Sequence, residues 1–165
     1  AFALAGFEII LLLVLQLTVG NMYQATGLIL AGLMAGLAVG AGIKTNSPKR
    51  KTIFALSLAL ILIYLTAGMS AGSVMNIENN ILTTIILIIM GFIPAAVTGF
   101  FFRELTHPET TKLKPSKIYS SDLAGSALGF LLFSGFLVPL LGITYSLYML
   151  PVLILAGIVV SQLGK

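Results

Sequence analysis

Long apolar stretches separated by short polar breaks run along the whole chain and limit its fold more than any other feature. A helix needs about 20 mostly apolar residues to cross a bilayer. The sequence contains six such stretches, at residues 2–20, 25–43, 52–70, 81–102, 118–137 and 143–163. They are too continuously apolar for barrel strands, in which lipid-facing and lumen-facing residues alternate. We therefore expect an all-α integral membrane bundle of six transmembrane helices, forming one domain over residues 1–165.

The composition excludes several classes of function. Only 8% of the residues are charged and 58% are hydrophobic, whereas soluble domains are about one quarter charged. The net charge of +4 comes from breaks between apolar stretches, so we expect the lipid bilayer, and not nucleic acid, as the partner. The chain has no cysteine and a single histidine, His107, which excludes cysteine nucleophiles, thiolate metal sites and a bis-histidine haem within the chain. We expect no cofactor, no metal and no enzymatic activity.

The positions of the basic residues predict the orientation of the spans. Lys and Arg near span ends are biased towards the cytoplasm. If the chain starts inside, all nine basic residues fall on the inner side. These are Lys44, Lys49, Arg50, Lys51, Arg103, Lys112, Lys114, Lys117 and Lys165. We therefore expect both ends in the cytoplasm, in the cytoplasmic membrane of a prokaryote.

Glycines at a spacing of four residues form the clearest packing signal. Gly32, Gly36 and Gly40 share one face of the second span, and Gly125 and Gly129 form a similar stripe on the fifth. Small residues at this spacing let helix backbones approach closely in membranes. We expect a contact within the monomer, with a dimer face or a substrate path as alternatives. The second and fifth spans are thus candidates for the centre of the bundle.

Two carboxylates in the apolar spans are the main candidates for a site. Glu8 and Asp122 both lie roughly 6 to 9 Å from the inner end of their spans, at a rise of about 1.5 Å per residue. Intramembrane carboxylates are costly and usually face a partner or a cavity. The partner is a loop cation such as Arg103 or Lys117, a proton or a cationic ligand. For Asp122 the alternative is helix capping by the sequence SSD at the start of the fifth span.

Other polar residues and prolines have ordinary explanations beside functional ones. Gln16 and Tyr23 lie towards the outer side, where interhelical hydrogen bonds and interfacial anchoring are common. Pro94 is a candidate for a kink at mid-depth, and transporters do place ligands at broken helices. Pro139 is expected to end the fifth span in a tight turn that reaches Gly142.

Three stretches together resemble the membrane region of the multi-pass spermidine synthase-like proteins. The first is the opening helix with Glu8, Gln16, Gly20 and Tyr23, running into AGLMAGLAVGAG. The others are MGFIPAAVTGFFFRE and IYSSDLAGSALGFLLFSGFLVPLLG, the second of which contains Tyr119 and Asp122. The resemblance implies a membrane domain coupled to a soluble aminopropyltransferase-type enzyme, with a polyamine as the cation. The enzyme's glycine-rich nucleotide loop and acidic catalytic residues have no counterpart here, so synthase activity does not carry over.

We therefore expect a non-catalytic membrane domain that binds or moves a small cation such as a polyamine. The candidate residues are Glu8 and Asp122, with Gln16, Tyr23 and Tyr119 beside them. One alternative is an anchoring subunit that holds a soluble enzyme domain or other membrane subunits at its cytoplasmic loops. A second alternative is half of a secondary transporter, which predicts inverted symmetry between spans one to three and spans four to six.

Overall fold

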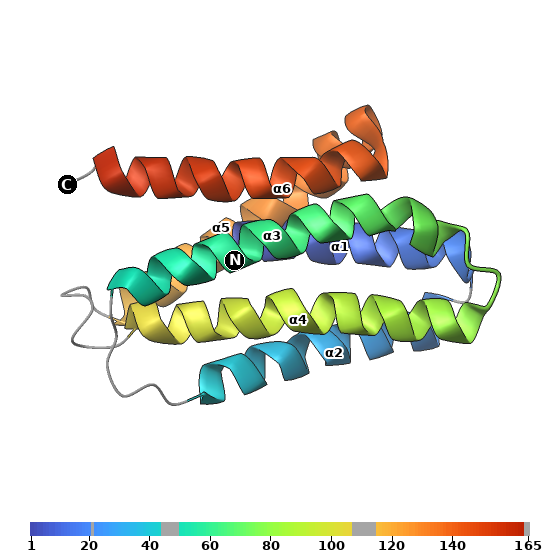
Figure 1. Ribbon diagram of the computed structural model, residues 1–165, viewed down its shortest axis with the longest axis horizontal. Coiled ribbons are helices and arrows are strands. Elements are labelled where there is room, and N and C mark those ends of the chain that lie inside the picture. The colour runs from blue at the N-terminus through green and yellow to red at the C-terminus, as the bar shows by residue number, and fades with distance from the viewer. Residues whose placement is uncertain (21, 44–49, 107–114, 164–165) are drawn as a thin grey trace.

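The computed structural model describes residues 1–20, 22–43, 50–106 and 115–163. They form six α-helices and one short π-helical segment, η1, arranged as a bundle (Figure 1). The bounds are α1 Phe2–Thr18, α2 Met22–Gly42, α3 Arg50–Met75, α4 Asn80–Thr106, α5 Pro115–Leu132, η1 Phe133–Leu137 and α6 Val138–Leu163. The prediction of an all-helical fold is confirmed.

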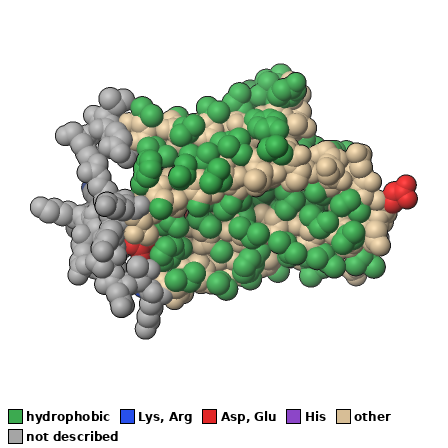
Figure 2. Space-filling view, in the orientation of Figure 1, with side chains coloured by type: hydrophobic (Ala, Val, Ile, Leu, Met, Phe, Trp, Pro, Cys, Tyr) green, Lys and Arg blue, Asp and Glu red, His purple; other side chains and the backbone are tan. Residues whose placement is uncertain are grey.

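Four helical stretches are long and apolar enough to cross a membrane. They are Tyr23–Gly42, Thr52–Met75, Asn80–Thr106 and Ser116–Val159, and the apolar α1 is shorter, at 17 residues. Apolar side chains cover the flank of the bundle that Figure 2 shows. Such a surface suits lipid and not water. The chain is therefore an integral membrane protein.

Consecutive helices run in opposite directions, so the connections gather at two ends of the bundle (Figure 1). The helices α2 and α4 end, and α3 and α5 begin, at one end, which we call the basic end because Arg103 and Lys117 lie there. Glu78, in the link from α3 to α4, lies at the opposite end. The described links at the opposite end are short, and no described Lys or Arg lies at that end.

The core of the bundle centres on α1, and the prediction that the second and fifth spans form the centre is wrong. The helix α1 contacts every other helix. Its side chains Phe7, Ile10, Leu11 and Leu15 are almost completely buried. Large apolar side chains of α1 point outwards around most of its circumference, so this helix can pack against neighbours on several sides. The glycine-rich α2 instead lies at the side of the bundle, against α4.

The glycine stripe of α2 brings its backbone against that of α4. Gly32, Gly36 and Gly40 all face α4. A Cβ atom at Gly36 would lie 2.5 Å from the Phe92 carbonyl oxygen and 2.9 Å from the Ala95 Cβ atom. Hydrophobicity gives little drive for helices to associate in lipid, so this close van der Waals contact is a main source of stability.

The Gly36 contact predicts a large effect for a single methyl group. Gly36→Ala forces α2 and α4 apart, and we expect a loss of roughly 1 to 3 kcal/mol in the free energy of unfolding. Gly72 in α3 is the matched control, because a Cβ atom there meets nothing within 4 Å. Gly72→Ala is expected to keep or raise stability through helix propensity. Unfolding in detergent, followed by circular dichroism, measures both; equal stability of the two variants contradicts the packing role.

The chain reverses at Gly142 and not at Pro139, so the prediction that Pro139 ends the fifth span is wrong. The π segment η1 comes just before this proline, and the Val138 N–H donates to the Phe133 carbonyl, five residues back. A π-turn widens the helix, which makes room for a proline ring that clashes with the carbonyl group four residues before it. The helix therefore continues to Gly142, where φ is 79° and ψ is 174°.

Gly142 predicts a second sensitive position. These dihedral angles are almost exclusive to glycine, and a side chain there costs about 1 to 3 kcal/mol. We expect Gly142→Ala to lower the unfolding temperature in detergent. The control is Gly135→Ala in η1, where φ is negative and a Cβ atom meets nothing within 4 Å. An unfolding temperature of Gly142→Ala equal to that of Gly135→Ala contradicts the strain argument.

Candidate cation-binding site

Asp122 lies two turns inside a helix and does not cap one. The helix α5 begins at Pro115 and not near Ile118, so Asp122 is its eighth residue. The neighbouring hydroxyl groups of Ser120 and Ser121 donate to the carbonyls of Lys117 and Ile118. The capping interpretation of this cluster is therefore wrong. Asp122 is an ionisable side chain within an apolar helix that has to find its partner on another helix.

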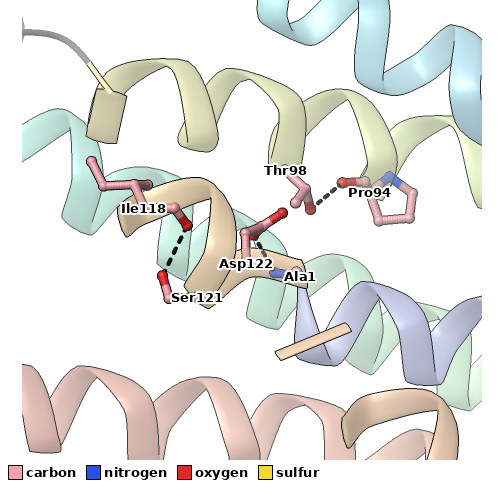
Figure 3. A network of polar contacts seen from close by, with 6 residues as sticks. All are labelled: Ala1, Pro94, Thr98, Ile118, Ser121 and Asp122. Atoms are coloured by element: carbon pink, nitrogen blue, oxygen red, sulfur yellow. Dashed lines mark hydrogen bonds and ion pairs between the residues drawn. The ribbon is translucent and has the colours of Figure 1, made fainter. Parts of the chain in front are cut away.

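Three helices meet around the Asp122 carboxylate. The Ala1 nitrogen, at the start of α1, lies 3.5 Å from Asp122 Oδ1. On the side of α4, the carboxylate points towards the Thr98 side chain (Figure 3). The Asp122 side chain is 38% exposed. A carboxylate and a hydroxyl oxygen on facing helices are both hydrogen-bond acceptors, which suits an ammonium group.

Pro94 supports this junction from within α4. The helix α4 runs without interruption through Pro94, which is buried. The Thr98 hydroxyl donates to the Pro94 carbonyl oxygen at 2.8 Å. That bond uses the hydroxyl proton, so Thr98 Oγ1 does not donate to the Asp122 carboxylate and is available to accept a hydrogen bond from a third group.

Glu8 lies on the same side of α1 as the Asp122 junction, but deeper. Seven residues separate Glu8 from Ala1, which is two helical turns and places both on one face. The axial separation is about 10 Å, at about 1.5 Å per residue. Glu8 is half-buried. The structure thus aligns the two carboxylates along one face of α1 without bringing them to a common depth.

The remaining candidates lie apart from the junction. Tyr119 is on the first turns of α5 at the basic end, with an exposed side chain. Gln16 and Tyr23 lie at the opposite end, on the last turn of α1 and the first turn of α2, and Tyr23 is 96% exposed. An exposed tyrosine at a helix end is typical of anchoring in the membrane interface. The five candidate side chains therefore do not form one site.

The sequence did not indicate a role for Glu104 and placed Arg103 in a loop, because α4 is longer than the apolar stretch. The apolar stretch ends at Phe102, which placed Arg103 in the following loop, but α4 continues to Thr106. Glu104 is only 3% exposed, and its Oε2 atom is buried without a hydrogen-bond partner, as is Arg103 Nη1. Nothing in the local sequence, three phenylalanines and an arginine before Glu104, indicates that this side chain is buried.

The structure contains a small cavity that does not suit a cation. It has a volume of about 10 Å³. Its lining is apolar and comes from α1, α3, α4 and α6, through Ile10, Leu11, Val14, Ala71, Val74, Leu87, Met90 and Leu147. A buried water needs two or more polar partners, which this lining lacks. Within the described residues no three metal-ligating side chains lie together.

Comparison with protein-family models, curated proteins and solved structures finds no match for the chain.

Proposed function

We propose that the chain crosses the membrane six times, with both ends in the cytoplasm. The stretch Ser116–Val159 has 44 residues and would extend about 66 Å as a straight helix, more than twice the hydrocarbon thickness of about 30 Å. The reversal at Gly142 divides it into two spans. The 17 residues of α1 are at the short end of the range for a span. The basic end faces the cytoplasm by the positive-inside rule, in a prokaryotic inner membrane.

Cysteine labelling tests this topology directly, because the chain has no cysteine of its own. Single cysteines replace Thr45, Glu78 and Thr110. We expect a membrane-impermeant maleimide added to intact cells to label Glu78→Cys alone, and all three after permeabilisation. Labelling of Thr45→Cys and Thr110→Cys on opposite sides contradicts the six-span arrangement.

We propose further that this domain binds or moves a small organic cation at the Asp122 junction. The single observation that supports this role is the position of Asp122, which lies inside α5 where α1 and α4 meet it. Acceptor oxygens from the Asp122 carboxylate and the Thr98 hydroxyl favour a protonated amine. The resemblance to spermidine synthase-like membrane regions favours a polyamine, and a soluble enzyme domain or other membrane subunits as partners at the basic end.

Neutralising Asp122 tests the proposal. Spermidine is the probe, and binding is measured on the protein in nanodiscs. A charged hydrogen bond contributes roughly 1.5 to 3 kcal/mol, so we expect Asp122→Asn to weaken binding about tenfold or more. Glu78→Gln, at the opposite end, is the matched control and is expected to bind as the parent does. An unchanged affinity in Asp122→Asn removes the site.

The same measurement separates the anchoring role from cation binding. An anchoring subunit does not bind spermidine in any variant, and it co-purifies with a soluble enzyme or membrane subunits whether or not Asp122 is neutralised. Spermidine binding is also measured for Glu8→Gln, because Glu8 lies along the same face of α1, about 10 Å from Ala1.

A further inference from the structure

Two helix pairs in this bundle pack in the same way. The helices α2 and α4 run parallel and touch at Gly36, where a Cβ atom would lie 2.5 Å from the Phe92 carbonyl oxygen and 2.9 Å from the Ala95 Cβ atom. The helices α5 and α1 also run parallel. They touch at Gly129, where a Cβ atom would lie 2.5 Å from the Phe2 carbonyl oxygen and 3.1 Å from the Ala5 Cβ atom. Both contacts join a glycine to a phenylalanine carbonyl and an alanine.

The likeness extends along both pairs with a fixed register. One turn further on, Gly40 faces Ala96 in the first pair, and Phe133 faces Gly6 in the second. One shift of 90 positions therefore carries Phe2, Ala5 and Gly6 onto Phe92, Ala95 and Ala96. A shift of 93 carries Gly36 and Gly40 onto Gly129 and Phe133. The same shift aligns residues 30–36, LAGLMAG, with residues 123–129, LAGSALG.

The other helix contacts follow the same exchange of α1 with α4, α2 with α5 and α3 with α6. The contact between α3 and α4 corresponds to the contact between α6 and α1. The contact between α1 and α2 corresponds to the contact between α4 and α5. The exchange maps the contact between α1 and α4 onto itself, and it does the same for the contact between α3 and α6. These four helices line the apolar cavity. Two contacts have no counterpart within the described residues: α1 with α3, and η1 with the α6 helix that follows it directly in the chain.

The two sets of three helices have opposite orientations. The helices α1 and α4 run in opposite directions (Figure 1). An axis in the membrane plane therefore relates α1–α3 to α4–α6, which is the arrangement of inverted-repeat transporters. The relation also accounts for the depths of the two acids. The shift of 90 carries Glu8 onto Thr98, and the shift of 93 carries Ile29 onto Asp122. Each of the two acids therefore belongs to a different repeat, and the two acids lie on opposite sides of the axis.

We propose that the bundle is a pair of inverted three-helix repeats that rock against each other and expose their interface alternately at the two ends. Equivalent contacts in the two repeats give two arrangements of similar free energy, and such bistable packing is how small shifts become alternate access. This inference rests on the six-span arrangement proposed above. It does not depend on the identity of the cation.

Spin labels at four exposed positions test the rocking motion. The pair Ile43→Cys with Ser116→Cys joins α2 and α5 at the basic end, and Tyr23→Cys with Phe136→Cys joins them at the opposite end. The shift of 93 carries Ile43 onto Phe136 and Tyr23 onto Ser116, so the two label pairs are counterparts. We expect pulsed electron resonance in nanodiscs to give two distance populations for each pair. A single population for both pairs overturns the proposal.

Matched glycine variants give the sharper result. Gly36→Ala loosens the pair α2 and α4, and Gly129→Ala loosens its counterpart, α5 and α1. Because the repeats are inverted, we expect the two variants to shift the populations at a given end in opposite directions. A shift in the same direction, or none, overturns the proposal. Spermidine binding is measured on the parent protein in the same nanodiscs, and absence of binding with the opposite shifts retained removes the cation site and leaves the repeats standing.

Discussion

Close contact between helix backbones is the interaction on which this structure depends. In lipid, every backbone amide is paired within its helix, and apolar side chains gain little by leaving the lipid for one another. Packing density must then hold the helices together. Gly36 on α2 and Gly129 on α5 meet this need by presenting no side chain, and each places its backbone against a carbonyl of the neighbouring helix. The large side chains of α1 fill the centre of the bundle.

The sequence predicts the elements of this fold well, because each rests on local composition. The helical stretches and the glycine faces follow from apolar length and from the spacing of small residues. The partners of the faces do not follow, since spacing says that Gly32, Gly36 and Gly40 share a face but not that α4 covers it. Helix ends in polar segments also differ from the predicted ones. The helix α5 begins at Pro115, before the apolar stretch, and α4 continues through Arg103.

The same limits explain which parts of the candidate site could be predicted. Asp122 and Glu8 stand out in sequence because an acid in an apolar span is rare. Their relative depth depends on how α1 and α5 are aligned, which packing of Gly129 on Phe2 determines. The similarity of the two halves is faint in sequence because only a few small residues carry it, whereas contacts in space preserve the register.

The reversal at Gly142 has a consequence for how the molecule presents itself to its surroundings. One residue, with no intervening loop, returns the chain into the bundle. In the six-span arrangement proposed above, the described residues therefore leave scarcely any polypeptide beyond the lipid on that side. Antibodies, proteases and soluble proteins approaching from that side would meet little more than helix tips among the described residues.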